Sequence, residues 1–221
     1  MVPPPTDEAE LLRRAQALLG ESLEALSQRL GLSLGGAPVA TKGKVGELLE
    51  RALGASGGSA ATWDFPALRV ELKTVPVGPA GVPRESTFVC SVSLFDADRA
   101  EWAESWVRAK LTRVLWVPIE AGAGADTRTV GQARLWSPTA DQERGLAADF
   151  EEILGRVGAG DIEGLSAHVG RWLQLRPKAA HGRVRTDAPG RDGDRVSTVP
   201  RGFYLRARFT GAILADPDAL P

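Results

Sequence analysis

The sequence predicts a mixed α/β protein in which residues 1–221 form one folded domain. Two patterns support this fold class: stretches with apolar residues at helical spacing alternate along the chain with short β-branched segments. The composition agrees, because 43% hydrophobic and 25% charged residues are ordinary values for globular proteins and exclude disordered, collagen-like and coiled-coil chains. Neither an internal repeat nor a linker between independent domains is visible.

The apolar spacing places helices near residues 11–19, 22–30, 44–53, 105–111 and 146–157. Asp7 and Glu10 resemble a capping box at the start of the first helix. Strands are expected over residues 68–77, 86–94, 114–119, 172–176 and 203–208. Residues 180–197 are rich in Gly, Arg and Asp and lack apolar periodicity, which predicts a long polar loop.

Cysteine and histidine are too rare to build a disulfide framework or a zinc cluster. The chain has 1 Cys and 2 His, so a bound metal would need oxygen ligands. No apolar run has the length of a membrane span, and the first residues do not resemble a secretion signal. We therefore expect a soluble, cytoplasmic protein that does not engage a membrane.

Basic residues are concentrated near the C-terminus, although the whole chain has a formal net charge of −1. Residues 171–210 contain ten Lys or Arg and three Asp or Glu, a local net charge of about +7. Local charge density of this kind favours a polyanion partner such as nucleic acid. Solvated, Arg-rich loops are the alternative explanation.

The most informative stretch for chemistry is the strand that contains Glu71 and Lys73. Strand alternation places Val70 and Leu72 on one face and Glu71 and Lys73 on the other. Asp64 precedes this strand and is expected to fold back beside Glu71, so that two carboxylates converge on a divalent cation. Mg²⁺ would activate water there, and the ammonium would stabilise developing negative charge. An exposed Glu-Lys strand face without catalytic function would give the same pattern.

A third acid is available on the helix before this strand. Glu50 lies four residues after Gly46 and three before Leu53, so it is able to face the same site. Glu47 on the same helix is an equally good candidate by spacing, and an ordinary solvent-facing Glu is the alternative for both.

Uncommon short motifs in a fixed order extend over nearly the whole chain. They include VELKT at residues 70–74, RPKAA at 176–180 and PRGFYL at 200–205. Others lie at residues 42–43, 46–50, 53–56, 64–65, 87–90, 107–111, 113–116 and 135–138. In these motifs the chain closely resembles the MutH family of mismatch-repair endonucleases, within the PD-(D/E)xK nuclease superfamily.

The resemblance implies a restriction-endonuclease-like fold: a mixed central sheet flanked by helices, in a monomeric clamp with two arms around a DNA cleft. The N-terminal arm with the catalytic core would cover residues 7–119, and the C-terminal arm with the recognition elements residues 130–214. MutH-like enzymes nick the unmethylated strand of hemimethylated GATC sites before the G. They use Mg²⁺, for which Mn²⁺ or Ca²⁺ substitutes in binding, and they are stimulated by MutL and indirectly by MutS.

The resemblance also assigns the catalytic residues. Asp64, Glu71 and Lys73 match the catalytic triplet, Glu50 matches a helical acid that helps to place metal or water, and Lys110 matches a further lysine implicated in activity. Asp64, Glu71 and Glu50 are therefore the expected metal ligands.

By the same resemblance, DNA contacts fall on Lys42, Arg176, Pro177, Lys178, Arg201, Gly202 and Tyr204. Lys42 would contact the phosphate backbone. Arg176 and Lys178 would donate to guanine in the major groove, with Pro177 stiffening the segment. Tyr204 would sense the methyl group of adenine. Phosphate contact is the alternative for both basic residues, and a half-buried strand aromatic is the alternative for Tyr204.

Departures from the family pattern concern the polar loop and the C-terminal end. Pro189 and several glycines stand where a more helical segment is expected, and residues 215–221 lack an apolar helical tail. Two other activities remain open: a GATC-specific restriction endonuclease that cuts both strands, and a methylation-sensing DNA-binding module that does not cleave. A chain of 221 residues favours one active site, and the Asp64, Glu71 and Lys73 set argues against a module without catalysis.

Overall fold

The computed structural model describes residues 2–32, 41–58, 62–122, 127–162, 164–165, 169–179 and 183–218. The chain divides into two compact units. Unit 1 consists of Met1–Arg84, Thr112–Ser137 and Ile213–Pro217, and unit 2 of Glu85–Leu111, Pro138–Ala212 and Asp218–Pro221. Helices and several sheets are present, so the mixed α/β fold class is confirmed. The contiguous subdivision into residues 7–119 and 130–214 stays a prediction.

Unit 1 begins with three helices, α1 (Glu8–Gln16), α2 (Leu23–Arg29) and α3 (Thr41–Leu53). The Asp7 carboxylate accepts a hydrogen bond from the Glu10 amide at 2.7 Å, as a helix N-cap does. The Glu10 carboxylate accepts from the Thr6 amide at 2.7 Å rather than from Asp7, so the reciprocal half of the expected box is displaced by one residue.

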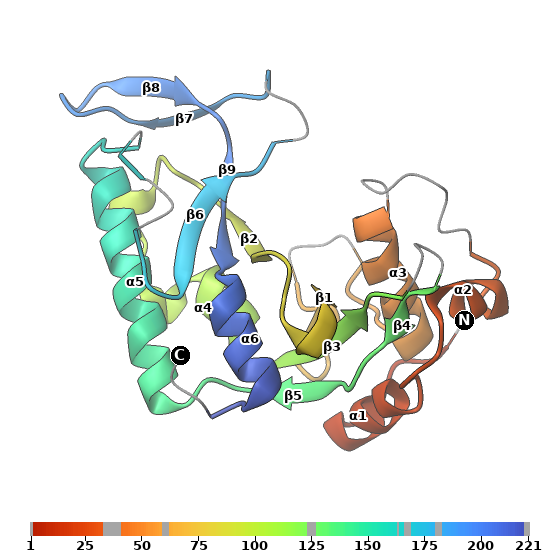
Figure 1. The fold of residues 1–221 in the computed structure, drawn as a ribbon. Helices are drawn as coiled ribbons and strands as arrows, with labels where there is room; N and C mark the ends of the chain where they lie inside the picture. The colour runs from red at the N-terminus through yellow and green to blue at the C-terminus, as the bar shows by residue number, and fades with distance from the viewer. Residues whose placement is uncertain are drawn as a thin grey trace. The chain divides into compact units, whose positions relative to one another are not determined.

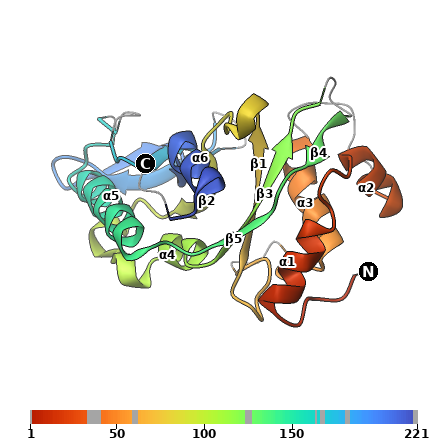
Figure 2. The ribbon, with the colours of Figure 1, turned by 60° about the horizontal axis from the view of Figure 1, so that its bottom comes forward.

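The sheet of unit 1 is built around β3 (Val114–Glu120). β1 (Glu71–Val77) pairs with it in parallel, while β4 (Thr129–Val130) and β5 (Arg134–Trp136) pair antiparallel. Figures 1 and 2 show α1 and α3 beside this sheet. Val70 and Leu72 belong to an apolar cluster with residues of these helices and of β3. That packing determines which face of β1 points away from the core.

Unit 2 contains an antiparallel sheet with the order β2 (Thr87–Val92), β9 (Arg201–Leu205) and β6 (Leu173–Pro177). The long helix α5 (Ala140–Gly158) runs beside β6 (Figure 1). Phe150 of α5 stacks on Phe203 of β9, with ring centroids 5.4 Å apart. Phe203 therefore faces the core, and alternation sends Gly202 and Tyr204 to the other face. Unit 2 also contains the short helix α4 (Trp106–Leu111) and the 3₁₀ turns η2 (Ala97–Arg99) and η3 (Trp102–Glu104), whereas the 3₁₀ turn η1 (Pro79–Gly81) belongs to unit 1.

The prediction of a loop over residues 180–197 is wrong for much of that segment. β7 (Thr186–Pro189) and β8 (Arg195–Thr198) form an antiparallel hairpin, closed by a 2.8 Å bond from the Gly190 amide to the Asp194 carbonyl. Gly193 in the turn has φ of +77°, which suits glycine. Strands of four residues with few buried side chains leave almost no apolar periodicity in the sequence. Residues 180–182 of the predicted loop lie outside the described residues.

The strand expected over residues 203–208 is also too long. β9 ends at Leu205, and α6 (Ala207–Ala215) begins two residues later. Phe209, Thr210 and Ile213 are buried at helical spacing, so an apolar helix does follow β9, although it ends at Ala215. No helix among the described residues combines the length and the apolar character that crossing a membrane requires.

Candidate functional site

The strand β1 brings Glu71 and Lys73 together on one face, as the alternation predicts. Lys73 Nζ lies 2.7 Å from Glu71 Oε1, and the side chains are 13% and 5% exposed, respectively. In such a sheltered place an ammonium and a carboxylate interact more strongly than they would in water. The pair is therefore held in one geometry rather than solvated separately.

Asp64 folds back onto the same strand. A tight turn brings Phe65 beside Val70, with the Phe65 amide donating to the Val70 carbonyl at 3.0 Å. Beyond this turn, Asp64 Oδ2 accepts a hydrogen bond from the Leu72 amide at 2.7 Å. The expected fold-back is confirmed: the Asp64 carboxylate is fastened to the strand between Glu71 and Lys73.

The structure also distinguishes the two acids of α3. Glu47 is exposed and pairs with Arg51 at 2.7 Å, as a residue on the solvent side does. Glu50 is only partly exposed. Burial raises the pKa of Glu50, and the charges of Asp64, Glu47 and Glu71 raise it further, while Lys73 lowers it. Glu50 thus experiences the charges of the β1 group, and it completes a cluster of three acids and one lysine within unit 1.

This cluster suits a hard divalent cation. Mg²⁺ is usually held by one or two carboxylates together with waters and phosphate oxygens. The carboxylates of Asp64, Glu71 and Glu50 exceed the single charge of Lys73, and the charges of Asp64 and Glu71 add to burial in raising the pKa of Glu50. Among the described residues no group of three or more His, Cys, Asp and Glu side chains is already closed around a metal position. The residues fit a site that phosphate and water complete, rather than a cage made of protein alone.

The raised pKa of Glu50 predicts a stability gain for Glu50→Gln. Folding favours protonated Glu50, so the cost of its charge appears as the pH rises above the ordinary pKa of 4.5. We expect Glu50→Gln to raise the melting temperature at pH 8 in EDTA, with a gain that shrinks toward pH 4. Glu47→Gln is the matched control and should lower the melting temperature slightly or leave it unchanged. A Glu50→Gln protein that melts below wild type at pH 8 would contradict the electrostatic description.

For two further predicted site residues the structure gives no position relative to this group. Lys110 is on α4 in unit 2, 9% exposed, with Nζ 5.3 Å from the centre of the Trp106 ring. Its membership of the catalytic group stays a prediction. Lys42 falls within α3 by its backbone, and its side chain lies outside the described part of the structure.

The sheet of unit 2 collects most of the predicted DNA contacts. We call the side of this sheet that carries Phe88, Gln174, Arg176, Gly202 and Tyr204 the polar face. Phe88 and Gln174 are the partners of Tyr204 in the neighbouring strands, and Arg176 is the partner of Gly202. The four sequence-predicted residues Arg176, Lys178, Gly202 and Tyr204 therefore gather in one place.

The cations of this face rest on aromatic rings. Arg176 Cζ lies 5.7 Å from the Tyr204 ring centre, and Lys178 Nζ lies 4.5 Å from that of Phe88. Phe88 and Tyr204 meet edge to face at 5.2 Å. Within the described residues neither Arg176 nor Lys178 forms a salt bridge, and both are exposed, so their donors remain able to bind an anion or a base edge.

Gly202 and Arg201 differ in their surroundings in β9. A Cβ at position 202 would lie 2.8 Å from Phe88 Cε2 and 2.9 Å from the Cys90 carbonyl oxygen, so only glycine allows this approach. Arg201 is 8% exposed, and its buried Nε has no hydrogen-bond partner among the described residues. Pro177 pairs with Arg201 and is exposed at the end of β6. Contact of Arg201 and Pro177 with DNA stays a prediction.

Burial raises the pKa of Tyr204; the nearby Arg176 charge lowers it and the Glu85 charge raises it.

Sequence reasoning gave no role to Phe88 or Gln174. The signal for Gln174 is a polar residue between Leu173 and Leu175 in an otherwise apolar strand. Phe88 is the second residue of β2, and only the pairing of β2 with β9 brings it to Tyr204.

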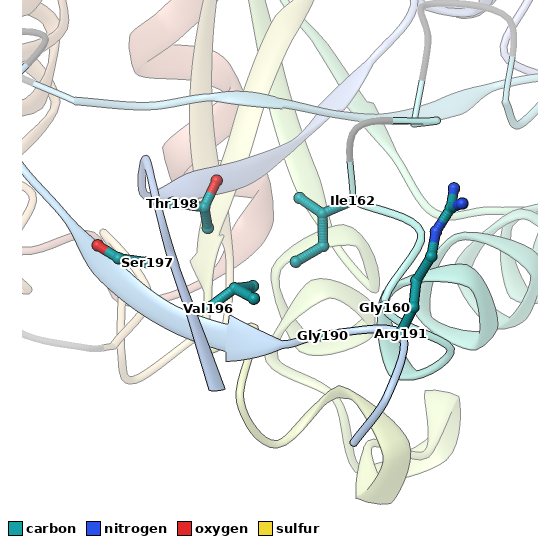
Figure 3. A pocket seen from close by; sticks show the side chains of 7 residues that line it. All are labelled: Gly160, Ile162, Gly190, Arg191, Val196, Ser197 and Thr198. Atoms are coloured by element: carbon teal, nitrogen blue, oxygen red, sulfur yellow. The ribbon is translucent and has the colours of Figure 1, made fainter. Parts of the chain in front are cut away.

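Unit 2 also has a pocket of about 310 Å³ between the end of α5 and the β7–β8 hairpin (Figure 3). It is lined by Gly160, Ile162, Gly190, Arg191, Val196, Ser197 and Thr198. Arg191 pairs with Asp161 at 2.8 Å. None of the residues predicted for catalysis or DNA contact lines this pocket, so we assign it no part in the reaction.

Comparison with known proteins supports the family resemblance that the sequence motifs indicate. A family model described as "DNA mismatch repair enzyme MutH" matches residues 53–149. The DNA mismatch repair protein MutH of Serratia proteamaculans is 46% identical over 215 residues, covering 96% of this chain and 94% of the relative. That of Escherichia coli (strain K12) is 44% identical over 217 residues, covering 97% and 95%. That of Yersinia enterocolitica is 45% identical over 214 residues, covering 96% and 94%. The chain therefore belongs to the MutH family of DNA mismatch repair enzymes.

Proposed function

We propose that this protein is the endonuclease of methyl-directed DNA mismatch repair, which nicks the unmethylated strand of hemimethylated GATC sites. The observation that carries the proposal is the cluster of Glu50 on α3, Glu71 and Lys73 on β1, and Asp64 before β1, in a chain of the MutH family. Three carboxylates that are able to hold a divalent cation, together with one ammonium group, are the functional groups that phosphodiester hydrolysis needs. The PD-(D/E)xK core and the clamp with two arms belong to the same proposal.

In the proposed reaction, water attacks a backbone phosphorus atom. One P–O bond forms, the P–O bond to the neighbouring nucleoside breaks, and the leaving oxygen takes up a proton. Lys73, whose ammonium is held 2.7 Å from Glu71, adds positive charge where the phosphate oxygens become more negative. Asp64 and Glu71 orient the reacting groups from a rigid strand, because the Leu72 amide fixes the Asp64 carboxylate.

The carboxylates of Asp64 and Glu71, with Glu50 beside them, would hold Mg²⁺, with Mn²⁺ or Ca²⁺ as substitutes in binding. A cation bound there supplies a more acidic water and neutralises phosphate charge. Lys110 is proposed as a further lysine of the active site.

Recognition of GATC is proposed for the polar face. We expect the exposed donors of Arg176 and Lys178 to contact guanine, Pro177 to stiffen the end of β6, and Tyr204 to meet the adenine methyl. Gly202 keeps Phe88 close to β9, and we also propose that Arg201 contacts DNA. Lys42 is proposed to bind phosphate.

The partners that follow are double-stranded DNA with a GATC site, MutL, and MutS indirectly. We propose that the protein acts as a cytoplasmic monomer and does not bind membranes.

Strand-resolved cleavage of three duplexes tests the proposed function. Unmethylated, hemimethylated and fully methylated GATC duplexes are incubated with the protein and Mg²⁺, with and without MutL. Nicks on unmethylated strands only, before the G and more frequent with MutL, are the expected result. Concerted cutting of both strands would favour a restriction endonuclease, and specific binding without cleavage at any Mg²⁺ concentration would favour a sensing module.

Base recognition and phosphate contact are separated by comparing affinities. Arg176→Ala or Lys178→Ala should weaken binding to GATC more than to scrambled DNA, by about 1–3 kcal/mol if a bidentate base contact is lost. Lys42→Ala should weaken both alike and reduce the salt slope by about one. Titrations at several salt concentrations measure both effects. Equal losses on both DNAs for all three variants would show that the recognition residues are misassigned.

A further inference from the structure

Tyr204 occupies the middle of a row across the polar face. β9 lies between β2 and β6, and Tyr204 stands directly opposite Phe88 on one side and Gln174 on the other. Side chains that oppose each other in this way have Cβ atoms about 5 Å apart and are in contact range. The orientation of the Tyr204 ring therefore depends on both neighbours.

Gln174 is fixed by a bond that crosses β9. Its Nε2 donates to Ser86 Oγ at 2.6 Å, although Ser86 immediately precedes β2 on the far side of β9. Because Thr87 pairs with Leu205, Ser86 lies level with Arg206, and the bond runs diagonally past Tyr204. The bridge thus closes the side of Tyr204 that faces Arg206.

The other sides of the ring have their own contacts. Phe88 meets it edge to face at an interplanar angle of 63°, and Arg176 lies over it. Gln174 is 5% exposed, and burying an amide is costly unless it is hydrogen-bonded. An apolar residue would fill the same place in β6 without that cost, so packing alone does not explain a glutamine there.

We infer that Gln174, held by Ser86, is a positioning residue for Tyr204 and thereby sets how well the protein distinguishes methylated from unmethylated adenine. The bridge holds the ring in one orientation on the polar face, where a methyl group would be felt as a steric contact. The second half of this inference rests on the proposed function, whereas the first concerns the conformation of the free protein.

The conformation is tested by fluorine NMR. Tyr204 is the only tyrosine of the chain, so 3-fluorotyrosine labelling reports this ring alone. Ser86→Ala removes the bridge without changing Gln174, and Gln174→Leu removes it while keeping the volume. Both should move the resonance toward the position of the free amino acid. Gln142→Leu is the control: Gln142 is another buried glutamine of unit 2, in the capping box of α5 with Thr139.

Recognition is tested by the ratio of dissociation constants for fully methylated and hemimethylated GATC duplexes, measured with Ca²⁺. Ser86→Ala and Gln174→Leu should each reduce this ratio by about fivefold, as expected for one neutral hydrogen bond. The double variant should lose no more than either single one, and Gln142→Leu should keep the wild-type ratio.

The outcomes separate the two claims. A wild-type resonance position in both bridge variants overturns the inference, as does an equal effect of Gln142→Leu. A wild-type ratio in both bridge variants overturns it as well when Tyr204→Ala lowers that ratio. If Tyr204→Ala keeps the wild-type ratio, methyl sensing by Tyr204 fails, and the fluorine spectra alone decide whether Gln174 positions the ring.

Discussion

Replacing Glu71 with Gln or Asp64 with Asn is expected to abolish nicking while DNA binding persists. Each substitution keeps the size of the side chain and removes one negative charge from the cluster that Asp64 and Glu71 form with Glu50 and Lys73. Metal assistance in phosphoryl transfer contributes several kcal/mol, so the rate should fall about 10³-fold or more. Affinity for GATC duplexes in EDTA should stay or increase slightly, because an acid that repels phosphate has been neutralised.

The matched control is Glu47→Gln, which neutralises an acid on α3 that is exposed and paired with Arg51. It should nick at the wild-type rate. Glu71→Gln also leaves Lys73 without its 2.7 Å partner, so circular dichroism must establish that the variant is folded. Mg²⁺-dependent nicking at the wild-type rate in folded Glu71→Gln and Asp64→Asn would remove both residues from the catalytic assignment.

The grouping of Glu71 and Lys73 could be predicted from the sequence because strand periodicity is a strong geometric constraint. Once residues 70–73 are read as a strand, Glu71 and Lys73 must share a face, and the structure shows that they also form an ion pair at 2.7 Å. The choice between Glu47 and Glu50 was not accessible, because both positions fit the helix. The packing of α3 decided it: Glu50 is partly buried and lies within reach of the charges of Asp64, Glu71 and Lys73, whereas Glu47 is exposed and pairs with Arg51 one turn further along the same helix.

The polar face, by contrast, could not be predicted from the sequence as a whole. Alternation within β9 predicts that Gly202 and Tyr204 share a side. Gln174 and Phe88, however, lie about 30 and about 115 residues before Tyr204 in the sequence, and they meet it only because their strands pair with β9. The β7–β8 hairpin was missed for a related reason. Its strands are held by backbone pairing and bury few apolar side chains, so local sequence contains little sign of them.

The largest expected stability loss is at Asp149. This residue of α5 is 6% exposed, and its carboxylate accepts backbone hydrogen bonds from Arg171, Trp172 and Leu173 at 2.7, 2.6 and 2.7 Å. Oδ2 accepts two of the three, so an asparagine amide in either orientation turns a donor toward at least one of these amides. Hydrogen bonds to charged groups contribute about 1.5–3 kcal/mol each, and a buried amide left without a partner costs about 1–3 kcal/mol.

We therefore expect Asp149→Asn to reduce the free energy of unfolding by about 3–5 kcal/mol, which lowers the melting temperature by roughly 10 °C for a chain of this length. Urea unfolding followed by circular dichroism measures the loss. Glu152→Gln is the control on the same helix, since it breaks only an exposed pair with Arg156 at 3.4 Å and should cost less than about 0.5 kcal/mol.

The three amides lead directly into β6, which carries Gln174 and Arg176, so Asp149→Asn should also weaken GATC binding at temperatures where the protein is still folded. A loss of stability no larger than that of Glu152→Gln would mean that the start of β6 is held by its pairing with β9 and not by Asp149.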